Sequence, residues 1–158
     1  MDALFPGLKA LLNYHPLFVH FPIALWTAAL LFEIAALALK QEALHRASCS
    51  ALALGALAAV AAVFSGWSAQ GAVPQAGGVH DVMELHENLM ISASILSGIL
   101  AAFGLFVLPR KSGGGMRAAF VAGLVVLVGL MALGADRGAQ LVYQFGTGVD
   151  WATAQKQK

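Results

Sequence analysis

Four long apolar stretches constrain this chain more than any other feature. They cover approximately residues 17–39, 47–67, 81–108 and 116–135 of the 158-residue sequence, and the third becomes apolar only after a polar first turn. An α-helix rises ~1.5 Å per residue and the hydrocarbon core of a bilayer is ~30 Å thick, so ~20 apolar residues suffice to span it. Each stretch is therefore expected to cross a membrane once.

The spans are expected to be helices. Backbone N–H and C=O groups inside a bilayer must pair within the protein, and the alternation of a membrane β-barrel is absent. With 59% hydrophobic and 11% charged residues, the chain has too few polar residues to cover a soluble domain. Short connections favour neighbouring antiparallel helices. We therefore predict an all-α membrane protein, a four-transmembrane-helix up-down bundle forming one domain over residues 1–158, with Trp26 and Trp67 facing lipid or the interface.

The charges of the loops predict an orientation. The loop after the first span carries Lys40 and Arg46, the third loop carries Arg110 and Lys111 with Arg117 nearby, and the middle loop has no Lys or Arg. Cytoplasmic loops are enriched in these residues. Loops one and three are thus expected in the cytoplasm, and both termini, with a short tail after residue 135, on the outer side. The N-terminus does not resemble a cleaved signal peptide, so the first span is expected to remain.

Four of the five histidines lie where two spans begin on the predicted outer side. His15 and His20 open the first span, and His80 and His86 open the third. These spans cross in the same direction, so depth predicts His20 opposite His86, and His15 opposite His80. His45, in the first loop, is expected to be an ordinary solvated residue.

The paired histidines predict a haem. Diagonal helices of a four-helix bundle are ~14 Å apart, which suits an iron porphyrin with one imidazole on each face. A single cysteine, Cys49, rules out the two-cysteine attachment motif of haem c. We expect one haem b with His20 and His86 as axial ligands. His15 and His80 would then contact propionates, a quinone head group or a second metal, and the ligand pair His15 and His80 is the alternative.

Other readings of the same histidines remain open at this stage. Interfacial histidines can simply extend into the head-group region. A zinc or copper site is the rival to haem, because the third span offers imidazole and carboxylate ligands together, namely His80, Asp81, Glu84 and His86. No run of Lys and Arg with interleaved aromatic residues is present, so no nucleic-acid partner is expected.

Two further charged residues fall within or beside the spans. Glu33 lies inside the first span, where carboxylates are rare and often functional. It could serve a proton path or a quinone, or it could pair with Lys40 or Arg110, or stay protonated. Arg137, after the fourth span, could neutralise a haem propionate or form an interfacial anchor with Asp136.

Two motifs resemble a known family. The segments HPLFVHFPIAL (His15 to Leu25) and LVYQFGTGV (Leu141 to Val149) are similar to those of bacterial membrane proteins classed as domain of unknown function 2231. The family has an H-P-L-x-V-H-F-P-I-x-L start, a histidine early in the third span, and a G-x-x-L-V-Y-x-H-G-x-G-V end. The residues that match are His15, His20, Pro22, His86, Gly138, Leu141, Val142, Tyr143, Gly146, Gly148 and Val149. Phe145 stands where the family usually has a histidine, so any role of that histidine is absent here.

The resemblance implies an electron-transfer setting in a bacterial inner membrane, because family members are joined to cytochrome c-like domains. We therefore expect a haem b membrane subunit without substrate chemistry of its own, which passes electrons between the quinone pool and an outward-facing redox partner. The alternatives are a cofactor-free structural or assembly subunit of a larger complex, and a zinc- or copper-binding membrane protein.

Overall fold

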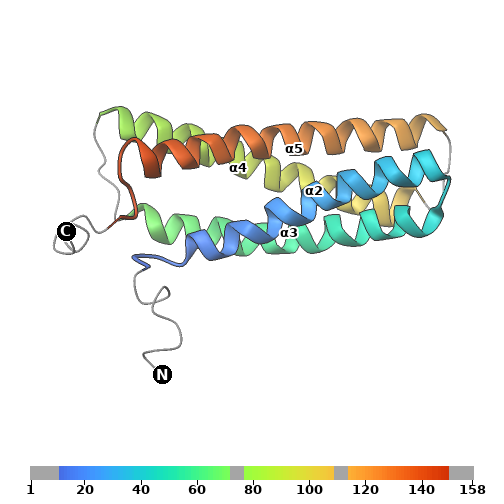
Figure 1. Cartoon of the computed structure of the whole chain (residues 1–158), viewed down its shortest axis with the longest axis horizontal. Coiled ribbons are helices and arrows are strands. Elements are labelled where there is room, and N and C mark those ends of the chain that lie inside the picture. The colour runs from blue at the N-terminus through green and yellow to red at the C-terminus, as the bar shows by residue number, and fades with distance from the viewer. Residues whose placement is uncertain (1–10, 72–76, 109–113, 150–158) are drawn as a thin grey trace, which may run out of the picture.

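Four long helices form one up-and-down bundle (Figure 1). The computed structural model describes residues 11–71, 77–108 and 114–149. The helices are α2 (His15–Leu39), α3 (Glu42–Gln70), α4 (Gly78–Ala102) and α5 (Gly114–Tyr143), and α4 continues into a π-helical turn, η1 (Phe103–Val107). The described residues contain no strand. The predicted fold class is confirmed.

The helices pack in chain order around the bundle. The closest packing joins α2 to α3 and α4 to α5; α3 also packs on α4, and α5 on α2. Helices α2 and α4 therefore lie on a diagonal. We call α2 with α3 the first hairpin and α4 with α5 the second hairpin.

The surface of the bundle is suited to lipid. All four helices are long and apolar enough to cross a membrane, and only 28% to 39% of the residues in the most apolar stretch of each are buried inside the protein. Large apolar side chains point outward from every helix, among them Leu31, Leu57, Ile95 and Leu133. Such a surface is stable against hydrocarbon and not against water. The chain is a multi-pass membrane protein that contacts the bilayer.

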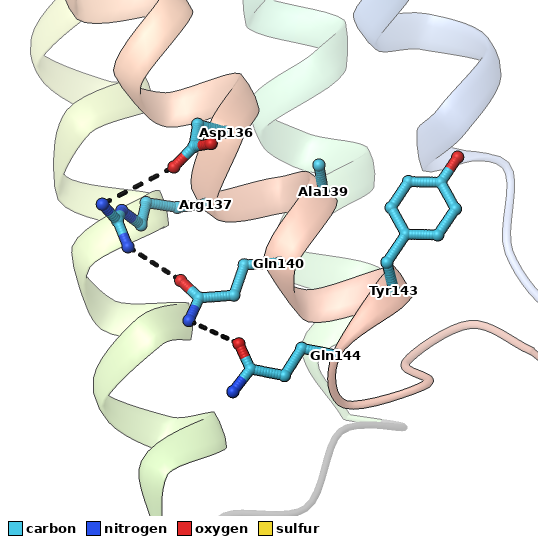
Figure 2. Close-up of a pocket in the computed structure, with 6 residues that line it drawn as sticks. All are labelled: Asp136, Arg137, Ala139, Gln140, Tyr143 and Gln144. Carbon is cyan, nitrogen blue, oxygen red and sulfur yellow. Dashed lines mark hydrogen bonds and ion pairs between the residues drawn. The ribbon is translucent and has the colours of Figure 1, made fainter.

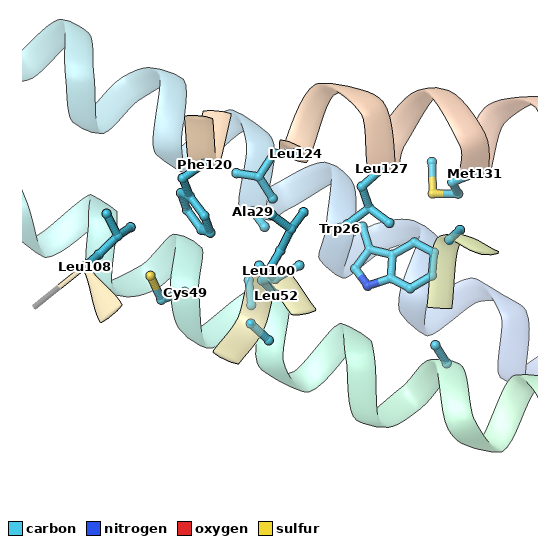
Figure 3. Close-up of a cluster of buried hydrophobic side chains, with 14 residues drawn as sticks. Trp26, Ala29, Cys49, Leu52, Leu100, Leu108, Phe120, Leu124, Leu127 and Met131 are labelled. Atoms are coloured by element: carbon cyan, nitrogen blue, oxygen red, sulfur yellow. The ribbon is translucent and has the colours of Figure 1, made fainter. Parts of the chain in front are cut away.

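The centre of the bundle holds one apolar cluster (Figure 3). Its largest members are Trp26, Leu52, Phe120, Leu124 and Leu127, all without exposed surface. The prediction that Trp26 faces lipid is wrong, because the opposite helix has a glycine where the indole lies. A Cβ atom at Gly55 would lie 2.6 Å from Trp26 Cδ1. Small residues of this kind let helices pack closely in a membrane.

The helices extend beyond the expected spans, most clearly at the end of α5, which continues to Tyr143 instead of ending near residue 135. The backbone N–H of Gly146 donates to Val142 O at 3.0 Å, and that of Thr147 donates to Leu141 O at 3.0 Å. Gly146 has φ 68°, a left-handed conformation that glycine adopts without strain. Together these features are a Schellman motif, which ends a helix. Part of the expected tail is therefore helix.

Candidate functional site at the histidine end

Two histidines from the diagonal helices meet at one end of the bundle. This end, where α2 and α4 begin, is here called the histidine end. The ring centroids of His15 on α2 and His86 on α4 are 6.5 Å apart, and the ring planes are nearly perpendicular at 87°. Both side chains are half-buried. Each hairpin thus contributes one imidazole to the same place.

The His15 ring is fixed by the neighbouring helix of its own hairpin. Its Nδ1 atom lies 3.1 Å from the carbonyl oxygen of Ala62 and 3.0 Å from Ser65 Oγ, both on α3. A carbonyl oxygen can only accept a hydrogen bond, so Nδ1 carries the hydrogen and donates it. The lone pair of the neutral ring is then on Nε2, the nitrogen available to a metal ion.

The His86 ring is held in the same way in the second hairpin. Its Nδ1 atom donates to the carbonyl oxygen of Gly134 on α5 at 2.7 Å. The hydrogen is again on Nδ1 and the lone pair on Nε2. No other hydrogen bond to either ring is found within the described residues. The two hairpins therefore fix the same tautomer.

A glycine lies against each imidazole, one helical turn beyond the accepting carbonyl. A Cβ atom at Gly66 would lie 3.2 Å from His15 Cε1, and one at Gly138 would lie 3.1 Å from His86 Cε1. Both distances are tighter than ordinary contact. The small-x-x-x-small spacing of Ala62 with Gly66 recurs as Gly134 with Gly138. Glycine is needed here because the ring lies directly on the backbone of the helix.

The two hairpins thus repeat one arrangement, which we call the histidine–glycine device. It consists of a histidine on the first helix, and a carbonyl and a glycine one turn apart on the second. A constant shift along the chain, to within one residue, carries His15, Ala62 and Gly66 onto their counterparts in the second hairpin. The histidine end is therefore nearly two-fold symmetric.

The expected pairing by depth is not the one observed. His20 is exposed and its Nδ1 contacts the carbonyl oxygen of Pro16 on its own helix; His80 is exposed at the start of α4. Successive helical residues turn by ~100°, so positions five apart point ~140° away from each other. When His15 faces the interior, His20 faces outward. The prediction used depth along the axis and ignored direction around it.

Arg137 is at the histidine end but bonds along its own helix. Its guanidinium donates to Gln140 Oε1 at 2.8 Å and lies 3.5 Å from Asp136 Oδ2, and Gln140 donates to Gln144 at 2.8 Å. Figure 2 shows these side chains along one side of α5, with Tyr143 on the other. They line an open surface pocket. The alternative prediction, a pair with Asp136, is therefore present, and a role toward a propionate stays a prediction.

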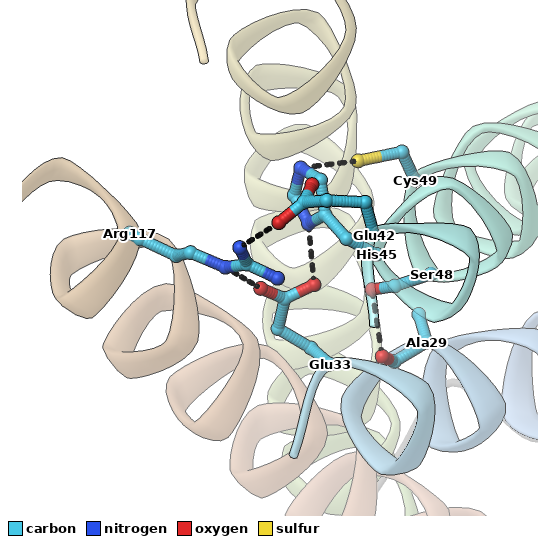
Figure 4. A network of polar contacts seen from close by, with 7 residues as sticks. All are labelled: Ala29, Glu33, Glu42, His45, Ser48, Cys49 and Arg117. Carbon is cyan, nitrogen blue, oxygen red and sulfur yellow. Dashed lines mark hydrogen bonds and ion pairs between the residues drawn. The ribbon is translucent and has the colours of Figure 1, made fainter. Parts of the chain in front are cut away.

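The opposite end of the bundle, here called the glutamate end, carries a buried polar cluster (Figure 4). Glu33 on α2 has no exposed surface. His45 Nδ1 on α3 lies 2.7 Å from Glu33 Oε2, and Arg117 Nε on α5 donates to Glu33 Oε1 at 2.9 Å. Arg117 Nη1 also donates to Glu42 Oε1 at 2.7 Å. A thiol completes the cluster, with Cys49 Sγ at 3.7 Å from His45 Nε2.

The structure corrects two expectations about this end. Glu33 pairs with Arg117 and His45, whereas Lys40 is exposed and Arg110 lies outside the described residues. His45 is half-buried and bonded to a carboxylate, so the prediction of a solvated residue is wrong. The first turns of α3 and α5 extend the helices beyond the expected spans, and this brings both side chains to the depth of Glu33. No sequence pattern identified that meeting of three helices.

The segment after α5 returns across the histidine end. A Cβ atom at Gly78, at the start of α4, would lie 3.9 Å from the Phe145 ring, and one at Gly148 would lie 4.0 Å from Asn13 Nδ2. Asn13 Oδ1 in turn accepts from the backbone N–H of His15 at 3.1 Å. The segment therefore connects the beginnings of both histidine helices. In the described parts of the chain, no three His, Cys, Asp or Glu residues are grouped to hold a metal ion.

A family model described as a predicted membrane protein, DUF2231, matches residues 12–151. The chain belongs to this family. No curated protein and no solved structure matches it. The resembling motifs of the DUF2231 family acquire a physical meaning in the structure. In the first motif, His15 faces the interior and Pro22 is buried. In the last motif, Gly138 lies on His86 and Gly146 ends α5.

Proposed function

We propose that this chain holds one haem b between His15 and His86 and serves as a membrane electron-transfer subunit. The observation that carries the proposal is the pair of imidazoles at 6.5 Å, each with its Nδ1 hydrogen bonded to a backbone carbonyl. Histidine ligands in metalloproteins almost always donate their second nitrogen in this way. The ligand pair differs from the predicted one, because His15 takes the place of His20.

The separation of the rings agrees with ligation of one iron. Two imidazoles on opposite sides of a metal ion have centroids about 6 Å apart, because each metal–nitrogen bond is about 2 Å and each centroid lies about 1 Å further on. His15 and His86 are at 6.5 Å. Their diagonal helices belong to different hairpins, which pack less closely on each other than the helices within each hairpin. A flat ligand between the hairpins would thus disturb the weaker contacts.

The residues of the chain would orient and bind the cofactor. Ala62 and Gly134 accept the Nδ1 hydrogens, which keeps each Nε2 lone pair unprotonated and directs the ring. Gly66 and Gly138 let the rings lie against the helices. When bound, haem b supplies a reversible one-electron iron couple.

The ligand count favours haem over zinc or copper. Zinc sites in proteins use three or four protein ligands. At the histidine end the described residues bring two imidazoles together, which is the number of protein ligands in a six-coordinate haem. Exposed Asp81 and Glu84 on α4 are not part of that pair.

The proposed direction of electron flow follows from the loop charges. Lys40, Arg46 and Arg117 lie at the glutamate end, which the positive-inside rule places in the cytoplasm. The histidine end then faces the outside of a bacterial inner membrane, together with both termini. There the subunit would exchange electrons between the membrane quinone pool and an outward-facing redox partner, and Arg137 could neutralise a propionate.

A reduced-minus-oxidised visible spectrum of the protein purified from its native membrane tests the proposal. We expect a low-spin b-type spectrum, and a pyridine haemochrome assay giving about one haem b per chain. Protein that is colourless and metal-free would overturn it in favour of a structural subunit. Stoichiometric zinc or copper without iron would overturn it in favour of a metal site.

Gly138→Val tests the fit of the ring against the helix. Valine needs space where a Cβ alone would lie 3.1 Å from His86 Cε1, so the imidazole must shift. We expect haem content to fall several-fold, or the iron to become high-spin as the ligand is lost. The matched control is Gly129→Val on the same helix, where nothing lies within 4 Å of the added Cβ. Equal haem spectra in both variants would contradict the assigned role of Gly138.

A further inference from the structure

We infer that the glutamate end is a proton-binding site, in which Glu33 and His45 together hold one exchangeable proton. This inference concerns the end of the bundle opposite to the histidine pair and does not depend on the proposed haem. Its first support is burial: Glu33 lies within a membrane span and has no exposed surface. A carboxylate in that position is costly unless its charge is compensated.

Counting charges leaves the cluster one proton short of neutrality. Arg117 is permanently cationic, but it bonds two carboxylates, Glu33 at 2.9 Å and Glu42 at 2.7 Å. With both carboxylates ionised and His45 neutral, the cluster carries one net negative charge. One proton on the His45–Glu33 pair makes it neutral. The low dielectric of the membrane span favours that neutral state.

His45 can hold this proton or release it without leaving either nitrogen unpaired. Its Nδ1 faces Glu33 Oε2 at 2.7 Å and its Nε2 faces Cys49 Sγ at 3.7 Å. A thiol is both a weak donor and a weak acceptor. It can therefore donate to Nε2 of the neutral ring or accept from Nε2–H of the imidazolium. Both protonation states fit the same side-chain arrangement.

His45 also supplies the way in. Its side chain is 13% exposed, whereas that of Glu33 is completely covered. A proton arriving from the polar side would reach the imidazole first, and the ring lies within hydrogen-bond distance of the carboxylate. Histidine is the side chain best suited to such exchange near neutral pH.

The other charged groups near the cluster are accounted for. On α2 these are Glu33 and the exposed Lys40; on α3 they are Glu42, His45, the exposed Arg46 and the thiol of Cys49; on α5 there is Arg117. The described part of α4 and η1 contributes apolar groups, with the Phe103 and Phe120 rings stacked at 6.3 Å. The exchangeable proton is therefore confined to the His45–Glu33 pair.

The repeat of the two hairpins shows what is unusual about this site. The same shift that relates the histidines of the other end carries His45 onto Arg117, and Glu33 onto Gly104. Equivalent positions of both hairpins thus bond one carboxylate, one through a permanent cation and one through a titratable ring. A Cβ atom at Gly104 would lie 3.0 Å from Cys49 Sγ, so a second acid has no space. Only one hairpin carries the groups that exchange a proton.

Infrared difference spectroscopy of the full chain in lipid nanodiscs, between about pH 5 and about pH 8, tests the inference. We expect imidazole and carboxyl bands from one proton taken up per chain. Glu33→Gln removes the carboxylate, and His45→Arg places at position 45 the cation found at its equivalent. Both variants are expected to lose these bands. The matched controls, Glu84→Gln and His80→Gln at the histidine end, are exposed and are expected to keep them.

His45→Arg makes the test decisive even if Glu33→Gln does not fold. It keeps a cation beside Glu33, so we expect normal helical circular dichroism together with loss of the bands. Folded His45→Arg protein that still shows the wild-type bands would overturn the inference. So would a wild-type difference spectrum that matches those of both variants.

Discussion

Purified His86→Ala protein is expected to contain no low-spin haem b. The substitution removes one of the two imidazoles at 6.5 Å and the hydrogen bond to Gly134 O, and no other histidine of the described residues lies within reach of His15 in the bundle interior. Losing one of two axial ligands changes the spin state and weakens retention of the cofactor. The measurement is the haemochrome content per chain, with His15→Ala expected to behave in the same way.

The histidines that depth alone would have selected provide the controls. His20 is exposed on the same helix as His15, and His80 is exposed on the same helix as His86. We expect His20→Ala and His80→Ala to keep the full haem content and the wild-type spectrum. If His20→Ala lost the haem while His15→Ala kept it, the ligand assignment made from the structure would be wrong.

Arg117→Leu is expected to have the largest effect on stability. It leaves Glu33, which is fully buried, without its permanent cation, and it removes the link from α5 to α2 at the glutamate end. Breaking a buried ion pair by removing one partner typically costs about 3–5 kcal/mol. The free energy of unfolding can be followed by circular dichroism in detergent mixtures with increasing SDS.

A double-mutant cycle separates pairing from packing. Glu33→Leu combined with Arg117→Leu removes both charges, so we expect the double variant to recover most of the lost stability. Glu42→Leu is the milder comparison, because Glu42 is 64% exposed and such pairs are worth about 0–1 kcal/mol. A double variant as unstable as Arg117→Leu alone would show that packing of the guanidinium, and not the charge of Glu33, matters.

The fold could be predicted from the sequence because its main determinant is local. The length and apolarity of each stretch fix a membrane-spanning helix, and short connections fix the order around the bundle. The helix ends could not be placed as well. A helix can continue past the hydrocarbon until a residue such as Gly146 ends it, so apolarity marks the membrane and not the helix terminus.

The site could be predicted only in part, since residue type and depth are visible in a sequence and direction around a helix must be inferred. His86 was identified with the correct helix and end, while its partner was displaced from His15 to His20 by the neglect of helical rotation. The clearest overlooked signal is glycine: Gly66 and Gly138 follow small residues by one turn in both hairpins. The Glu33 cluster joins three helices, and such contacts depend on tertiary packing.

The histidine–glycine device of each hairpin has a consequence for how such a protein could arise. Two parallel copies of a single hairpin, related by an axis along the membrane normal, would already place one imidazole from each copy on either side of that axis. Joining two such genes would preserve this symmetric end and release the other from it. The pairing of His45 with Arg117 around a lone Glu33 is the kind of divergence that a fused homodimer permits and a true homodimer forbids.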